Sequence, residues 1–574
     1  MKSHRPLLIR LSFYCIASIL MNGVSSAAVS VLGVMEHELD RSVKKLAQQP
    51  TPLYFLSYEI TEEKSSYVRA SFGTISASSD SERRLLDIDL RVGDYSLDNT
   101  HPIRERFGSG SRRFSQLEIP VSGIDALRNI LWYQTDRKFK DAIERLTMVK
   151  ANVQVKVKEE DRAADFSAES PEQALEDPHS LSLDRSIWED KLKQYTSPFS
   201  QSSHIYAADA ALSASVVTRW YVNSDGSKIR TAESRARLMI SALTKAEDGM
   251  ELPRYESFFS FDLNGLPDDS EVMEKVHAMI RDLEALRVAP IADPYTGPAI
   301  LSGRASGVFF HEILGHRVEG HRQKSEQDSQ TFKKMLGQRV LPETFTVVFD
   351  PTVRRIGPTD LAGSYRFDNQ GVKAQRVAVI EDGTLRRFLM SRTPIDGFSQ
   401  SNGHGRKQAG YAPVSRQSNL FVEVSKPHSR EALKAMLIER LNAENKEFGL
   451  FFEDIQGGFT TTGRMLPNAF NVLPIMVYRI YADGREELVR GVDLIGTPLT
   501  TFSKVAAASD QIEVFNGTCG AESGGVPVSA ASPAVLVSQI EVQKKEKSIE
   551  RLPLLPAPPG APHSLRVAAE GGAR

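Results

Sequence analysis

The hexapeptide HEILGH, residues 311–316, contains the residue types of a zinc hydrolase site. His311 and His316 can each offer an imidazole nitrogen to a metal, and Glu312 stands beside the first histidine, as the general base of the HExxH metalloproteases does. That shorter signature separates its histidines by four residues, whereas these two are five apart. The additional residue either abolishes a metal site or indicates a site of a different kind.

The five-residue spacing constrains the backbone between the two histidines. A regular α-helix turns by about 100° per residue, so side chains five residues apart point about 140° away from each other. Two imidazoles arranged in that way cannot share one ion. A π-type turn within 311–316 would bring them together, and Gly315 is the residue best able to permit one. The spacing therefore predicts a distorted helix that carries both histidines.

A third protein ligand is needed, because catalytic zinc commonly keeps three protein ligands and one open position for water. Two residues are candidates: His321, five residues after the second histidine, and Cys519 in NGTCGAESGGVPV. We favour Cys519, because a thiolate is the stronger zinc ligand. Glu312 would then act as general base on the water that zinc binds at its open position.

Each of these residues also has an ordinary structural interpretation. HEILGH alone is a short motif that can arise by chance. A lone Cys519 is most often a small buried core residue, and we interpret His321 as a solvent-facing residue just past the helix. The basic segment SNGHGRKQ, residues 401–408, is interpreted as a solvated loop rather than a substrate contact.

Length and composition are those of an ordinary globular protein with two or three domains. The chain has 574 residues, of which 41% are hydrophobic and 25% charged, and its formal net charge is −2. A nearly neutral chain gives no support for coating nucleic acid or an anionic membrane, so we expect no nucleic-acid partner. Removal of a signal peptide containing Cys15 would leave only Cys519, which excludes a disulfide framework in the mature chain.

The N-terminus has the three-part layout of a secretory signal peptide. Lys2 and Arg5 precede the apolar run LSFYCIASILM, and the small residues of GVSSAAVS follow. We assign residues 1–28 to this signal, in which Ala27 satisfies the small-residue rule for cleavage. The protein is therefore expected to be periplasmic or secreted, with no stable membrane span after signal removal. An uncleaved anchor and a cytoplasmic location are the alternatives.

The hydrophobic pattern predicts an α+β protein. Residues 29–290 are expected to form an N-terminal α/β domain with a mainly antiparallel sheet, long helices and a polar linker at about 158–185. Residues 291–545 are expected to form a β-rich C-terminal catalytic domain that carries the HEILGH helix. The Pro/Ala-rich residues 546–574 are expected to be disordered.

Several elements inside these domains are marked by local signals. Periodicity predicts helices at about 123–150, 270–287 and 429–445, and the pairs EDGT and ADGR predict two hairpin turns. The glycine-rich segment DIQGGFTTTGR either lets a peptide backbone approach closely, as an added strand, or is an ordinary flexible turn.

The chain resembles the TldD/PmbA family of zinc metallopeptidases. The segments that carry the resemblance are SGVFFHEILGHRVEGH and GTCGAESGGVPVSAASPAVLVSQIEV, with DNQGVKAQRVAVIEDGTLRRFLM and SNGHGRKQAGYAPVSRQSNLFV between them in the family's order. The resemblance is strong over about 298–542 and weak over the N-terminal half. It implies that His311, His316 and Cys519 hold the zinc and that Glu312 is the catalytic base.

The same resemblance implies a function and partners. It indicates a TldD-like, zinc-dependent metallopeptidase that hydrolyses peptide bonds in short or unfolded polypeptides. It also implies a dimer, either a homodimer or a heterodimer with a TldD/PmbA paralogue. The alternative is a non-catalytic metal-binding subunit that recognises peptides, since the family contains partners that have lost the motif residues. His321 stands where the family pattern has an acidic residue.

Overall fold

The computed structural model describes most of the chain and confirms the α+β class. The predicted signal peptide lies outside the described residues, as does the predicted C-terminal tail apart from Leu555. No helix in the described part is long and apolar enough to cross a membrane. The described residues are 30–103, 116–155, 161–465, 469–545 and 555.

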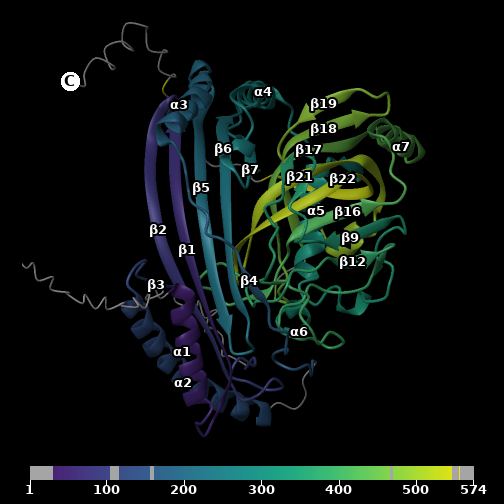
Figure 1. The fold of residues 1–574 in the computed structure, drawn as a ribbon. Helices are drawn as coiled ribbons and strands as arrows, with labels where there is room; N and C mark the ends of the chain where they lie inside the picture. Colours follow the sequence, from purple (N-terminus) through teal and green to yellow (C-terminus); the bar gives the residue numbers. More distant parts are fainter. Residues whose placement is uncertain (1–29, 104–115, 156–160, 466–468, 546–554, 556–574) are drawn as a thin grey trace, which may run out of the picture.

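A seven-stranded, almost entirely antiparallel sheet occupies the N-terminal half. Its order is β3-β2-β1-β5-β6-β4, and β7 pairs with β6. The four longest strands have 18 or 19 residues, so each extends for about 60 Å, and they stand side by side in Figure 1. The strands are β1 (Leu53–Ser71), β2 (Thr74–Val92), β3 (Leu117–Ile119), β4 (Gln173–Leu175), β5 (Ile205–Asn223), β6 (Lys228–Lys245) and β7 (Glu251–Ser260).

Helices cover this sheet at its two ends. One hydrophobic cluster joins α1 and α2 to β1 and β2, and another joins α3 and α4 to β5 and β6. The helices predicted at 123–150 and 270–287 correspond to α2 and α4. The bounds are α1 (Val31–Leu46), α2 (Ile124–Val155), α3 (Arg185–Thr196) and α4 (Asp269–Val288), with short 3-10 turns η1 (Ser197–Gln201) and η2 (Leu263–Gly265).

The C-terminal half contains an eleven-stranded sheet, part of which closes on itself. Strands β22, β20, β18, β17 and β8 pair in that order, and β8 pairs back to β22. Both predicted hairpins are present, β12 to β13 at EDGT and β18 to β19 at ADGR. The strands are β8 (Tyr295–Leu301), β9 (Phe345–Phe349), β12 (Val377–Glu381), β13 (Thr384–Leu385), β16 (Asn419–Val424), β17 (Phe448–Thr460), β18 (Phe470–Tyr481), β19 (Glu486–Val489), β20 (Val492–Gly496), β21 (Val505–Ala521) and β22 (Gly524–Lys544).

Shorter elements connect these strands. The helix predicted at 429–445 is α7, which packs on β8, β17 and β21. The bounds are α5 (Gly303–Ile313), η3 (Gly315–Arg317), α6 (His321–Lys324), η4 (Lys333–Met335), α7 (Arg430–Ala443) and α8 (Pro498–Phe502), with two-residue strands β10 (Arg355–Ile356), β11 (Thr359–Asp360), β14 (Gly405–Arg406) and β15 (Val414–Ser415).

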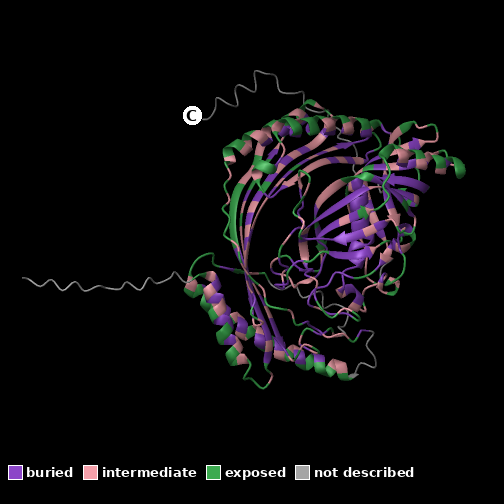
Figure 2. Ribbon diagram, turned by 45° about the vertical axis from the view of Figure 1, so that its right-hand side comes forward, coloured by how far each residue is buried: buried purple, intermediate pink, exposed green. Residues whose placement is uncertain are grey.

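Helix α5 lies against the inner side of this sheet and carries the first part of the HEILGH motif. It packs on β17, β18, β21 and β22, and residues 305–313 are all buried. A helix surrounded by protein must be apolar on nearly every side, which the sequence ASGVFFHEI provides. The Ser302 hydroxyl caps its start by accepting a hydrogen bond from the Ala305 amide at 3.1 Å. Figure 2 shows the buried colour concentrated in this half of the molecule.

Candidate metal centre

The backbone between the two histidines is not the π-type turn predicted from their spacing. Helix α5 ends at Ile313, and the 3-10 turn η3 carries His316. The Arg317 amide donates to the Leu314 carbonyl at 2.8 Å, a tightened rather than a widened turn. A Cβ on Gly315 would lie 1.9 Å from Gln417 Oε1, so this glycine serves a close side-chain approach. The prediction of a π-type turn is therefore wrong.

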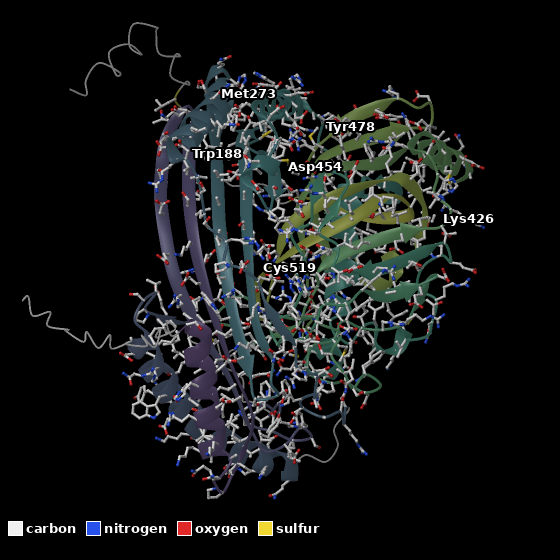
Figure 3. The ribbon with its side chains drawn as sticks, viewed as in Figure 1. Trp188, Met273, Lys426, Asp454, Tyr478 and Cys519 are labelled. Carbon is white, nitrogen blue, oxygen red and sulfur yellow. The ribbon has the colours of Figure 1, made fainter. Side chains whose placement is uncertain are left out.

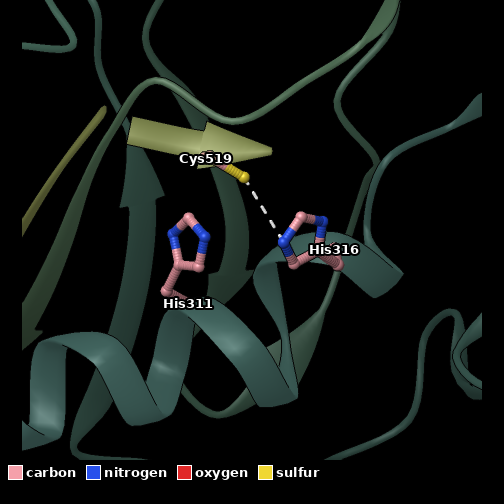
Figure 4. A group of neighbouring side chains, drawn as sticks. All are labelled: His311, His316 and Cys519. Carbon is pink, nitrogen blue, oxygen red and sulfur yellow. Dashed lines mark hydrogen bonds between the residues drawn. The ribbon is translucent and has the colours of Figure 1, made fainter. Parts of the chain in front are cut away.

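The change of direction after α5 nevertheless brings the two imidazoles together. Their ring centroids are 5.1 Å apart and their planes are nearly perpendicular. Cys519, on β21, places its Sγ 3.3 Å from His316 Nε2 (Figure 4). One ligand atom of each of His311, His316 and Cys519 lies within 4.8 Å of the other two, and all three residues are buried. The structure thus assembles the three residues favoured from the sequence, across 203 residues of chain.

The chemistry of this donor set fits zinc. Imidazole nitrogen and thiolate sulfur are both common zinc ligands, and catalytic zinc sites use three protein ligands whose donor atoms lie ~3.5 Å apart. Burial alone would raise the pKa of the Cys519 thiol, but the charges of His316 and His311 lower that pKa well below its usual range. The thiolate, which is the form that binds metal, is therefore favoured.

Glu312 is buried beside the first histidine with one oxygen unpaired. Among the described residues, its Oε2 has no hydrogen-bond partner. Burial raises the pKa of Glu312, an effect that His311 and His316 oppose. A Cβ on Gly458 of β17 would lie 2.7 Å from Glu312 Cγ, so the glycine-rich segment lies directly against this carboxylate. The arrangement suits a group that exchanges protons with a reactant.

His321 does not belong to the three-residue group. It begins α6, and its Nε2 contacts the carboxylate of Glu522 at the tip of the β21–β22 hairpin. Its side chain is only 15% exposed, so the interpretation as a solvent-facing residue is wrong. The pairing explains how an imidazole so near the centre is held away from the other three residues.

Buried charged side chains contact two of the candidate metal ligands, and the sequence alone did not reveal these contacts. Glu319 is fully buried, with Oε2 3.4 Å from His316 Nδ1 and 2.8 Å from Arg322 Nε. Arg416 Nε lies 3.3 Å from the other oxygen of Glu319, and its Nη2 donates to the Cys519 carbonyl at 2.6 Å. A buried carboxylate on the second ring nitrogen of a histidine ligand fixes its tautomer and orientation.

The charges around Glu319 keep it ionised. Burial by itself would raise the pKa of this carboxyl, but His316 and Arg322 outweigh burial and lower the pKa to about 2. The only sequence signal for this role was position, because Glu319 lies three residues after His316, within side-chain reach. Arg416 is distant in sequence and could not have been found in that way.

Two cavities border the centre. The first has a volume of about 530 Å³ and the second about 300 Å³, and His311, Glu312 and Gly458 line both. The first extends between the two sheets, past β6, β7 and β21. The second also touches His316 and Cys519. A reactant in the second cavity would therefore lie beside both Glu312 and the three-residue group.

Comparison with known proteins places the chain in a family. Residues 294–544 match the sequence model of the PmbA/TldA metallopeptidase C-terminal domain, and residues 165–286 match that of the family's central domain. The chain belongs to the PmbA/TldD family. The two matches together cover more than half of the chain, and the first contains every residue of the candidate metal centre.

Individual relatives agree with this assignment. Metalloprotease MJ0996 of Methanocaldococcus jannaschii is 28% identical over 311 residues, which are 54% of this chain and 64% of that protein. The zinc metalloprotease TldD homologue of Saccharolobus solfataricus is 22% identical over 253 residues, 43% of this chain and 51% of that protein. The chain thus spans less than two thirds of the length of either relative.

A solved structure supports the fold. TldE from Thermococcus kodakarensis superimposes with a TM-score of 0.57 at 14% identity, covering 89% of this chain and 100% of that one. At this identity the likeness shows a shared fold and nothing about activity.

Proposed function

We propose that this protein is a zinc-dependent metallopeptidase that hydrolyses peptide bonds in short or unfolded polypeptides. The observation that carries the proposal is the buried group of His311, His316 and Cys519 with the unpaired carboxylate of Glu312 beside it. The names of its relatives, metalloprotease and zinc metalloprotease TldD homologue, support the same activity.

Each residue of the centre has its own role in the proposed hydrolysis. Zinc held by the two histidines and the cysteine would polarise the scissile carbonyl and acidify a water molecule. Glu312 accepts a proton from the attacking water and passes it to the leaving amine, a role that its free oxygen and raised pKa suit. Glu319 and Arg416 keep His316 and Cys519 in place during these steps.

Access to the centre favours extended chains over folded proteins. His311 and Glu312 line both cavities, and the larger cavity lies between β6 and β7 of the first sheet and β17 and β21 of the second. A narrow, extended segment of polypeptide fits between these strands more readily than a folded domain. We propose that this geometry restricts cleavage to peptides and unfolded polypeptides.

A non-catalytic, peptide-recognising subunit is the alternative within the same family. A purely structural zinc site usually fills its fourth position and has no need of a base. The unpaired Oε2 of buried Glu312 favours the enzyme, because a buried carboxylate oxygen without a hydrogen bond is costly to retain beside a site that does no chemistry.

We further propose a dimer, with itself or with a TldD/PmbA paralogue, and export from the cytoplasm. The dimer proposal rests on membership of the PmbA/TldD family. The export proposal rests on the N-terminal segment at 1–28 alone.

Metal removal and restoration test the proposed activity. The purified protein is stripped with a chelator, reloaded with zinc, and incubated with a mixture of peptides that is then analysed by mass spectrometry. We expect cleavage that disappears on chelation, returns with zinc, and is absent in Cys519→Ala. Zinc binding without any cleavage would favour the recognition subunit, and cleavage that survives chelation would refute a metallopeptidase.

A further inference from the structure

The larger cavity beside the centre has in its wall an arginine, Arg237, that forms no ion pair with any described residue. The wall is formed by β6 and β7 of the first sheet and by α5, β17 and β21 of the second. Figure 3 shows Cys519 and Asp454 on the side of the second sheet that faces these strands. A volume of about 530 Å³ is within the range of cavities that enclose small ligands, so the cavity can hold a few residues of extended peptide.

Among the described residues, only one of the three guanidinium nitrogens of Arg237 forms hydrogen bonds. Its Nη1 donates to the Asn516 carbonyl at 3.2 Å and to Ser257 Oγ at 3.4 Å. The guanidinium lies 5.7 Å from the centre of the Phe259 ring. Within the described part of the chain, no hydrogen bond or ion pair engages Nε or Nη2, and neither atom is sealed from solvent. Two donors therefore remain for a ligand in the cavity.

The other charged groups of this cavity wall do not neutralise Arg237. Arg304, the second arginine in the wall, is paired with Asp454 at 3.1 Å. Glu271 is an exposed residue of α4, and no ion pair in the described chain joins it to Arg237. Burial and the nearby positive charge of Arg235 lower the pKa of Arg237, as expected for a cation without an anion. A guanidinium in this state is suited to bind a carboxylate in two parallel hydrogen bonds.

The hydrogen bond from Arg237 to β21 shows how far this arginine lies from the metal centre along that strand. Asn516, whose carbonyl it binds, lies three residues before Cys519 on β21. At about 3.3 Å per residue, the two positions are about 10 Å apart along the strand. An extended substrate would cover that distance with about three residues.

We propose that Arg237 binds a carboxylate of the polypeptide substrate about three residues from the scissile bond. This inference rests on the proposed peptidase function and adds the chemistry that selects the substrate. The carboxylate can be the C-terminal group of a short peptide or the side chain of an Asp or Glu within a longer one. Arg237 is thus a specificity-determining residue outside the metal centre.

Wild-type protein distinguishes the two sources of carboxylate. A peptide that the protein cleaves is prepared with its C-terminus three residues after the cut, once as the free acid and once as the amide. The same sequence is then extended at the C-terminus, with either Asp or Asn placed three residues before or after the cut. We expect kcat/KM to fall by about tenfold to a hundredfold when the recognised carboxylate becomes an amide. Equal rates for every acid and amide pair would overturn the inference.

Substitutions at Arg237 test whether this residue causes the preference for the acid peptide over the amide. Arg237→Met should lower kcat/KM for the acid peptide to the level of its amide, chiefly through a higher KM, and leave the amide peptide unchanged. Arg237→Lys should retain part of the preference, because a lysine keeps the charge without the planar fork. Arg235→Met is the control, since it removes the same charge from the same strand while Arg235 pairs with Glu233 at 2.7 Å.

The outcomes separate the inference from the function on which it rests. A full preference for the acid in Arg237→Met would overturn the inference while leaving the peptidase intact. Absence of cleavage of any peptide by zinc-loaded wild type would refute the proposed function, and the inference with it. If Arg237→Met does not fold, as its melting temperature would reveal, the Arg237→Lys variant decides: an acid preference as large as that of wild type would overturn the inference.

Discussion

Replacing the carboxylate behind one histidine should weaken zinc binding without touching a ligand. Glu319→Gln retains the size of the side chain but removes the charge that lies 3.4 Å from His316 Nδ1. Loss of such a partner typically weakens metal affinity by tenfold to a hundredfold, or about 1.4–2.7 kcal/mol of binding free energy. The variant should also leave the buried cations Arg322 and Arg416 with weaker compensation.

Two measurements follow the effect separately. Zinc affinity is obtained by competition with a chromogenic chelator, and stability from thermal unfolding with and without zinc. Bound zinc stabilises the folded state in proportion to the logarithm of its affinity. The increase in unfolding free energy that zinc produces should therefore be smaller in the variant by about 1.4–2.7 kcal/mol. Loss of ion pairing alone would lower the stability of both forms equally.

A matched variant shows whether the effect depends on contact with the histidine. Glu522→Gln also removes a carboxylate from Arg322, at 2.9 Å, but Glu522 contacts His321 rather than His316. Its zinc affinity should change less than that of Glu319→Gln. Equal zinc affinity in wild type and Glu319→Gln would refute the positioning role of Glu319.

Three further predictions test the centre, the ionic contacts between the sheets and the enclosed helix. Cys519→Ala should lose zinc while His321→Ala keeps it, as metal analysis of the purified variants would show. The opposite result would make His321, rather than Cys519, the third ligand. Lys407→Met should lower the unfolding free energy by about 3–5 kcal/mol at neutral pH, because it removes the ammonium 2.9 Å from buried Glu59. Burial alone would raise the pKa of Glu59, but Lys407 lowers it. The stabilisation by this ion pair is therefore present above a pH of about 4.3 and is lost as the pH falls. Urea titrations should show a smaller difference in unfolding free energy between variant and wild type at pH 4 than at pH 7. Phe310→Ala, at a fully buried position of α5, should cost about 3–5 kcal/mol of stability by the same titration, and a loss below 1 kcal/mol or so would contradict the enclosed position of the helix.

Residue types and order in the sequence were enough to predict which side chains gather at the centre. The two histidines and the glutamate of HEILGH indicated a metal site on a helix, and Cys519 was favoured as the third ligand because a thiolate binds zinc strongly. The exact path between the histidines was not predictable. At Gly315 the backbone forms a 3-10 turn, and the side chain of Gln417, distant in sequence, occupies the space that a Cβ would need.

The burial of charged residues was predicted wrongly where it depends on partners in the other sheet. The segment 401–408 was interpreted as a solvated basic loop, yet His404, Arg406 and Lys407 are buried. Lys407 is neutralised by Glu59 and Asp87 from β1 and β2, which no local pattern could reveal. For the same reason, nothing in the sequence singled out Arg237, since its lack of a partner appears only when the two sheets face each other.

Substitution of the proposed base tests the account most directly. Glu312→Gln is measured for zinc content and for cleavage of a peptide that wild type hydrolyses, with Glu522→Gln as a control for loss of a carboxylate near the centre. We expect one zinc per chain in Glu312→Gln, no detectable hydrolysis, and retained hydrolysis in the control. Full activity of Glu312→Gln would contradict the assignment of Glu312 as the base and, with it, the proposed mechanism.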